Sequence, residues 1–159
     1  MPSFSTRSLE RLMTCDTRLQ VLFKDIVEEF DCSILQGSRP KELQDEYYRT
    51  GRSKVKWPNS KHNGTPSLAV DVGPWVNGRV PWPKTPSNWN DRVQRNRYIK
   101  DLNQFYYFAG YVMERARIMD IELRWGGDWD SDHDLRDNHF DDLVHFELVV
   151  PKHAQAQEV

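Results

Sequence analysis

The sequence predicts a single α+β domain in which helices pack on a central, mostly antiparallel sheet. Segments with apolar residues at helical spacing alternate with short apolar runs, in the order helix, strand, helix, strand, long helix, strand, strand. At 159 residues, with 38% hydrophobic and 12% aromatic residues, the chain is large enough to bury a core. It contains no internal repeat or linker, so we predict one domain over residues 1–159.

In the N-terminal part, apolar residues recur at helical spacing from Ser8, which can cap a helix, to about Glu29 or Phe30. The run Cys32–Leu35 (CSIL) is typical of a short buried strand. A second helix is predicted over Lys41–Arg49, because a proline precedes it and Gly51 can close its C-terminal end.

In the rest of the chain, Ser67–Val72 (SLAVDV) alternates as a strand does, with Ala69 and Asp71 on one face. The longest helix is predicted from Asn90 or Asp91, as its cap, to about Met119. The last predicted elements are two strands, Ile121–Trp125 and His145–Val150, the second of which ends at Pro151.

Charge and cysteine content exclude several classes of protein. The formal net charge is -2, from 22 basic and 24 acidic side chains, so the chain has no basic excess for binding nucleic acid. No apolar run reaches the length of a membrane span, and no secretory signal is present at the N-terminus. We therefore expect no stable membrane association, and we expect Cys15 and Cys32 to be free thiols in the core. We also expect a monomer.

The segment Asn59–Pro74 (NSKHNGTPSLAVDVGP) places a histidine in a loop and an aspartate inside an apolar strand. A buried aspartate is costly unless a cation or hydrogen-bond donors meet it. His62, Asp71 and His145 could supply the three ligands of a catalytic zinc ion, which leaves its fourth position to water. His133 and His139 are competing ligands.

A hydrolytic zinc site also needs a base that takes the proton of the attacking water. Asp142 lies three residues before His145 and can point into the same cleft. Glu147 is the alternative, because it shares the strand face of His145; it could instead orient that histidine as a ligand. Asp141 is expected to be solvated.

These residues resemble a known family. The pattern of Ser60-x-His62, Ala69-x-Asp71 and Asp142-x-x-His145 is similar to that of the zinc peptidases that cut cell-wall peptides containing D-amino acids. The group includes D-alanyl-D-alanine carboxypeptidases and dipeptidases, and phage L-alanyl-D-glutamate endopeptidases. The resemblance covers about Leu9 to Val150. One departure is the step from histidine to aspartate, which is nine residues here and seven in the commonest form, so Gly64 does not correspond to the glycine of the motif.

The resemblance implies a hedgehog/DD-peptidase-like domain in which zinc is held by His62, Asp71 and His145, with Asp142 as general base. It places Arg39, from the segment QGSRP, where an arginine would stabilise the carbonyl oxygen or bind a substrate carboxylate. Other positions next to the substrate are Ser60, Trp125 and Trp129, with Gly126 and Gly127 in the same wall of the cleft.

The function that follows is a phage-type endolysin that cleaves the L-alanyl-D-glutamate bond of the peptidoglycan stem peptide. The alternatives are a D-alanyl-D-alanine carboxypeptidase and a non-catalytic binding module on the same fold. An endolysin of this kind accumulates in the cytoplasm of the host bacterium before lysis and then acts on the cell wall.

A second metal site is less well supported by the sequence. Asp128–Asp134 (DWDSDHD) resembles the start of a calcium-binding loop, but His133 replaces the glycine of the sixth position and His139 the glutamate of the twelfth. We expect a solvated acidic loop here and keep a regulatory calcium site as the alternative.

Overall fold

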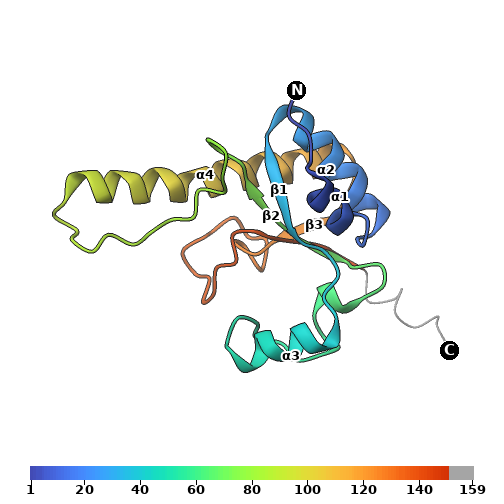
Figure 1. The fold of residues 1–159 in the computed structure, drawn as a ribbon. Coiled ribbons are helices and arrows are strands. Elements are labelled where there is room, and N and C mark those ends of the chain that lie inside the picture. The colour runs from blue at the N-terminus through green and yellow to red at the C-terminus, as the bar shows by residue number, and fades with distance from the viewer. Residues whose placement is uncertain (151–159) are drawn as a thin grey trace.

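The structure, a computed structural model, describes residues 1–150 and has the predicted α+β architecture. Its elements, drawn in Figure 1, are α1 (Thr6–Leu12), α2 (Thr17–Glu29), β1 (Cys32–Gln36), α3 (Lys41–Arg49), the 3-10 turn η1 (Lys61–Asn63), β2 (Ala69–Pro74), α4 (Arg92–Ile118), β3 (Leu123–Trp125) and β4 (His145–Leu148). No helix of the described residues is long and apolar enough to span a membrane.

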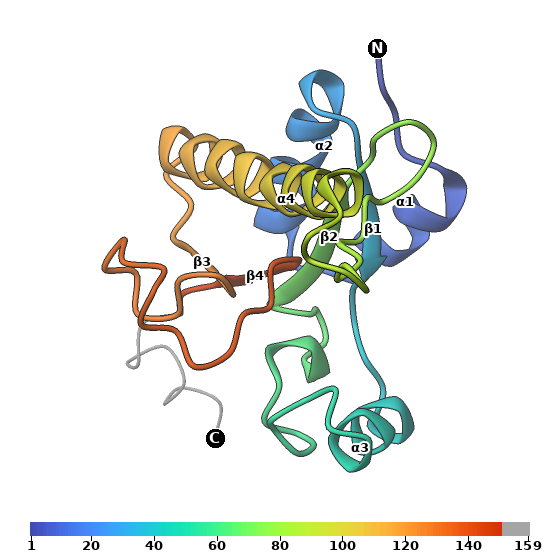
Figure 2. The same cartoon turned by 90° about the vertical axis from the view of Figure 1, so that its left-hand side faces the viewer.

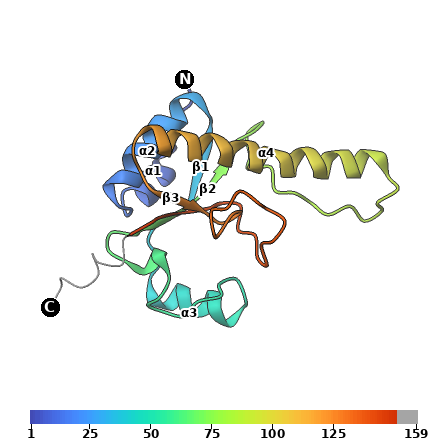
Figure 3. The same cartoon turned by 180° about the vertical axis from the view of Figure 1, so that it is seen from behind.

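The four strands form one antiparallel sheet in the order β1-β2-β4-β3. The central pair, β2 and β4, sets Asp71 directly opposite His145 and Val70 opposite Phe146. Because side chains alternate along a strand, these two pairs lie on opposite faces of the sheet. Figures 1 and 3 show α2 and α4 on one side of the sheet and α3 on the other.

The hydrophobic core fills the space between the sheet and the helices α2 and α4. Phe146 of β4 is fully buried and makes edge contacts with Phe23 of α2 and Phe108 of α4, with ring centroids 5.7 and 6.2 Å apart. Val70 and Val72 of β2 join the same core, as the alternation of the strand predicts. The other face of the sheet is thus free to carry the polar groups Asp71, His145 and Glu147.

The first helix is a correction to the sequence prediction, because it is two helices rather than one. α1 is capped by Ser5 rather than Ser8, whose buried hydroxyl instead accepts a hydrogen bond from the Ile34 amide. α2 is capped by Asp16. Between them the chain pairs with the segment before β2: the Asp16 amide donates to the Ser67 carbonyl at 2.8 Å.

The other predicted elements are present, with shifted ends. α3 spans the predicted residues, and α4 starts after its cap Asp91. The strands are displaced by a few residues, and β4 ends at Leu148. Pro151, predicted to end that strand, lies outside the described residues. Cys15 and Cys32 are buried free thiols, as predicted.

Candidate metal centre

Three side chains from distant parts of the chain meet on the polar face of the sheet. His62 belongs to η1, Asp71 to the middle of β2 and His145 to the start of β4. The Nε2 atom of His62 lies 3.0 Å from Asp71 Oδ1 and 3.2 Å from His145 Nδ1, and the last two atoms are 3.1 Å apart. The nine-residue step is accommodated by the turn between η1 and β2.

The orientation of the His62 ring is fixed by contacts on the side away from Asp71. Ser60 caps η1, and its hydroxyl accepts a hydrogen bond from the His62 amide. The other ring nitrogen, Nδ1, lies 2.8 Å from the Gly37 carbonyl oxygen, which can only accept. His62 therefore carries its proton on Nδ1, and the lone pair of Nε2 points at Asp71.

His145 is held in the same way by a carboxylate. Its Nε2 lies 2.9 Å from Glu147 Oε2, while Arg124 donates to the other oxygen of Glu147 from Nε at 3.0 Å. The arginine keeps Glu147 ionised, so the carboxylate accepts the Nε2 proton of His145. The lone pair of Nδ1 then faces Asp71.

The result is three acceptor atoms that face one another within hydrogen-bond distance. When both rings are neutral, His62 and His145 have no proton to share with Asp71. The lone pairs of the three atoms then repel one another, and a positive charge between them would relieve this repulsion. These three residues also form one of the two groups of the described chain whose ligand atoms could hold a metal ion. The donor set fits a divalent cation.

The pKa shifts point to the same demand for positive charge. Burial opposes ionisation of Asp71, but the charge and hydrogen bonds of His62 and His145 outweigh it, and its pKa is lowered. Burial alone would lower the pKa of His145, yet the hydrogen bonds to Asp71 and Glu147 raise it to about 9. When no metal is bound, a proton on His145 supplies the missing charge.

Arg39 lies directly beside this centre and is 6% exposed. Its Nη2 donates to Asp71 Oδ2 at 3.4 Å and its Nη1 to Gln44 Oε1 at 3.1 Å. The guanidinium stacks over the ring of Tyr47 at 4.7 Å. Its Nε is buried and has no hydrogen-bond partner among the described residues.

Asp142 lines the same cleft from the loop before β4. Its backbone amide donates to the Gly126 carbonyl at 2.8 Å, and its carbonyl accepts from the His145 amide at 3.1 Å, so its position is tied to the ligand. A Cβ at Gly126 would collide with the Asp142 carbonyl. The carboxylate accepts no hydrogen bond within residues 1–150, and burial, together with the charge of Asp71, raises its pKa.

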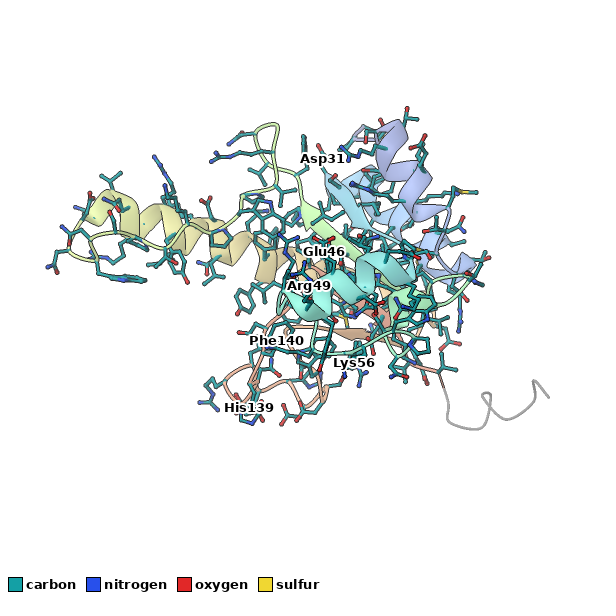
Figure 4. All side chains as sticks on the ribbon, turned by 60° about the horizontal axis from the view of Figure 1, so that its bottom comes forward. Asp31, Glu46, Arg49, Lys56, His139 and Phe140 are labelled. Atoms are coloured by element: carbon teal, nitrogen blue, oxygen red, sulfur yellow. The ribbon has the colours of Figure 1, made fainter. Side chains whose placement is uncertain are left out.

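These groups lie in a cleft of about 440 Å³. Some of the residues that line it were predicted from the sequence as site residues, and others were not. Sequence reasoning missed the residues that form its rim, which are Tyr47, Arg52, Ser53, Lys54, Val55, Asn59, Lys61, Arg124 and Phe140. Figure 4 shows the side of the molecule that holds α3; the labelled Phe140 belongs to the rim, and the labelled Lys56 follows the rim residue Val55 in the chain. For the rim residues between Arg52 and Lys61, the sequence feature that could have indicated their role is the run of basic residues before His62.

Comparison with known proteins identifies the family. The family model described as phage L-alanyl-D-glutamate peptidase matches residues 2–149. The chain belongs to this family. The L-alanyl-D-glutamate peptidase of Escherichia phage T5 is 26% identical over 136 residues, which are 84% of this chain and 86% of the relative. In fold, the peptidase is similar to the crystal structure of Serratia marcescens L-Ala D-Glu endopeptidase ChiX, with a TM-score of 0.64 and 24% identity over 93% of this chain and 91% of that one.

The two tryptophans predicted to wall the cleft of the peptidase have different positions. Trp129 lies in the wall, with its ring centroid 5.5 Å from that of His145. Trp125 is a correction: it is 6% exposed, packs on Tyr106 in the core and donates from Nε1 to the Leu143 carbonyl. As the last residue of β3 it points to the core face, opposite to Arg124.

The acidic loop of the peptidase brings three carboxylates together. Asp128, Asp130 and Asp132 form the second group of the described residues that could hold a metal ion. His133, in the position of the loop glycine, has a positive φ of 71°. Neither His133 nor His139 belongs to the group around Asp71.

Proposed function

We propose that this family member is a zinc-dependent peptidoglycan hydrolase, with a catalytic domain over residues 1–159, that cleaves the L-alanyl-D-glutamate bond of the stem peptide. The observation that supports zinc is the convergence of three ligand atoms, from His62, Asp71 and His145, in an open cleft. Two imidazoles and one carboxylate are a donor set typical of catalytic zinc.

In this proposal His62, Asp71 and His145 would hold the zinc, which when bound would polarise the scissile carbonyl and lower the pKa of the attacking water. Asp142 accepts the proton of the attacking water and returns it to the amine of D-glutamate as the bond breaks. Its free carboxylate supports this role, and so does its raised pKa, because a base that must also act as an acid works best when its pKa is not too low.

Arg39 stabilises the negative charge that develops on the carbonyl oxygen, or binds a carboxylate of the substrate. Its buried guanidinium is held by Gln44 and Asp71 and so needs little reorganisation. Glu147 and Arg124 keep the His145 ring in its ligand orientation.

The rim of the cleft supports an acidic substrate. Arg52 and Lys54 line it, held over the rings of Tyr47 and Phe140 at 5.4 and 5.5 Å, and neither pairs with a carboxylate of the described residues. In the stem peptide, D-glutamate keeps one carboxylate outside the peptide chain, so these cations can bind it next to the scissile bond. Ser60 and Trp129 lie beside the same path.

The family supports a cellular role as well. We propose that the enzyme accumulates in the cytoplasm of the infected bacterium and reaches the peptidoglycan during lysis. The claim is tested by fractionating infected cells before and after the onset of lysis, with the enzyme expected among the cytoplasmic proteins first.

The deciding experiment combines metal analysis with product analysis. The purified chain is expected to contain about one zinc per molecule. Hydrolysis of a soluble disaccharide-tetrapeptide should stop on chelation and return with zinc, giving fragments that end in L-alanine and begin with D-glutamate. Release of free D-alanine instead would identify a carboxypeptidase. A chain that is free of zinc and cleaves after chelation would contradict the metal site.

A further inference from the structure

The first half of α4 and the loop before it form an arm that projects from the body of the molecule. We define the arm as residues 75–101. Figures 1 and 3 show it extending sideways, with the loop running back along the helix, and Figure 2 looks along it. The first buried residue of α4 is Phe105, so the part of the helix within the arm contributes nothing to the core.

The arm is nevertheless ordered by contacts between its loop and α4. Trp82 packs on Phe105 and Trp89 on Tyr98, each with ring centroids 5.5 Å apart. The side chain of Gln94 accepts hydrogen bonds from the amide and hydroxyl of Ser87, both at 3.0 Å. The loop therefore fixes the helix from one side and leaves the rest of its surface to solvent.

The arm is strongly basic, in contrast to the rest of the chain. It carries six basic and two acidic side chains, a net charge of +4, whereas the whole chain carries -2 and the remainder therefore -6. None of these cations forms an ion pair with a residue of the described chain, although five arginines and lysines on other surfaces do so with neighbouring carboxylates. The six are Arg79, Lys84, Arg92, Arg95, Arg97 and Lys100.

Exposed aromatic side chains accompany the cations. Trp82 is 57% exposed and Trp89 53% exposed, although large aromatic side chains are usually mostly buried. Tryptophan combines apolar area with a polar N–H and is enriched at binding surfaces. Unpaired cations next to exposed tryptophans indicate a surface for a polyanion that also offers apolar faces.

A lipid bilayer fits this surface poorly. A helix that lies in a membrane needs a continuous apolar face. The exposed apolar residues of the arm helix are Val93 and Ile99, which are six positions apart and therefore point about 120° away from each other around the helix. Between them the surface is polar and charged.

We propose that the arm binds intact peptidoglycan through the carboxylates of its stem peptides and so retains the enzyme on its polymeric substrate. The proposal rests on the proposed function, since peptidoglycan is the substrate of the cleft. Each stem carries a free D-glutamate carboxylate and a carboxyl terminus, so the polymer is a dense array of negative charges next to sugar rings. A cationic arm raises the local concentration of enzyme on such a surface, and salt weakens the attraction.

The test compares a polymeric with a soluble substrate. In the arm variant, Arg92, Arg97 and Lys100 are replaced by Gln; Arg95 is left, because it is partly buried and donates to the Trp89 carbonyl. The control variant replaces Arg7, Lys24 and Arg49, three exposed cations outside both the arm and the cleft, by Gln. Both variants lose the same charge, so they separate the arm from a general effect of net charge.

The affinity for purified sacculi, measured by co-sedimentation at low salt, should fall about tenfold in the arm variant and little in the control. Each exposed ion pair contributes a few-fold to such an affinity. Hydrolysis of the soluble disaccharide-tetrapeptide should be unchanged in both. A charge-preserving variant, with Arg92→Lys, Arg97→Lys and Lys100→Arg, should bind as the original does. Amidation of the sacculus carboxylates should abolish the difference between the arm and control variants.

Equal binding of the arm and control variants to sacculi would overturn the proposal. So would binding of the original chain to anionic lipid vesicles or duplex DNA as tightly as to sacculi, which would indicate a general polyanion surface. Failure of the proposed function has a different signature: the soluble substrate would stay intact while binding to sacculi still depended on the arm.

Discussion

The two histidine ligands differ in how their outer nitrogen atoms are held. His62 donates to a neutral backbone carbonyl, whereas His145 donates to Glu147, a carboxylate whose pKa is held at about 2, against the effect of burial, by hydrogen bonds from His145 and Arg124. A charged partner raises the basicity of the ring that it orients. The hydrogen bond to Glu147 should therefore contribute more to metal affinity than the backbone bond of His62.

Replacement of Glu147 by Gln removes this charge but keeps the shape of the side chain. We expect zinc affinity to fall roughly 10- to 100-fold, as for other partners of metal-bound histidines. Competition with a chromophoric chelator measures it. The matched control is Glu122→Gln, an exposed residue just before β3, which should bind zinc as the original chain does. Unchanged affinity in Glu147→Gln would show that Glu147 does not orient the ligand.

Asp142 and its neighbour Asp141 provide a pair of variants for the general base. Asp142→Ala should keep zinc and lower kcat by roughly 10²- to 10⁴-fold, because a positioned base is lost while the ligands stay. Asp141, which is exposed, should tolerate the same change. Measurements are made on zinc-saturated enzyme with the soluble muropeptide. Full activity in Asp142→Ala would move the base to Glu147.

The ligand set could be predicted because its residue types occur in a short, spaced pattern, but the walls of the cleft could not. Trp125 and Trp129 are close in the chain, and only the phase of β3 decides that Trp125 points to the core. Arg52 and Lys54 reach the rim through a loop of bends and turns, whose path depends on contacts with distant residues rather than on local spacing.

At the scale of elements, caps predicted α3 and α4 well, but the break between α1 and α2 was missed. The apolar spacing continues from Leu12 to Leu19 as if the helix did, so periodicity alone cannot reveal the break. The break is stabilised by long-range pairing: Asp16 and Thr14 bond the backbone of Ser67 at 2.8 and 2.9 Å. Such a partner is invisible in the local sequence.

The cap at the break can be tested through stability. The Asp16 carboxylate accepts from the Arg18 amide and pairs with the Arg18 guanidinium, and the hydrogen bond to the Arg18 side chain is the largest cause of its lowered pKa. Asp16→Ala should lower the free energy of unfolding by about 1 kcal/mol at pH 7. Urea denaturation measures it, with Glu10→Ala, exposed in α1, as a control that should change it by less than about 0.5 kcal/mol.

The pH dependence of this difference follows from the direction of the shift. Because the pKa of Asp16 is lower in the folded than in the unfolded chain, its ionised form stabilises the fold fully above the unfolded value of about 3.9. That contribution is lost as the pH falls through the folded-state pKa. The original chain and Asp16→Ala should therefore converge in stability as the pH falls further below about 3.9; a difference that stays constant would assign the effect to something other than the charge.

For the molecule as a whole, the sheet separates stability from chemistry: one face packs the core and the other carries the cleft. The metal centre lies where η1, β2 and β4 meet, so a bound ion links segments that are far apart in sequence. An ion that binds only the folded chain stabilises it by mass action, by about 2.7 kcal/mol at a free concentration of 100 times its Kd. For a chain of this size that corresponds to a rise in Tm of roughly 5–11 °C.

Removal of the metal should therefore lower Tm by that amount, and zinc should restore it. Without the ion, the charge of Asp71 is balanced by Arg39 and by a proton on His145, which do not join His62, Asp71 and His145 as a metal with three ligands would. Differential scanning calorimetry with and without chelator measures the change. The matched control is Asp71→Asn, which keeps the size of the side chain but removes the anionic ligand, and its Tm should not respond to chelator or zinc. A Tm of the original chain that is insensitive to zinc, in a preparation that binds it stoichiometrically, would place the ion outside this centre.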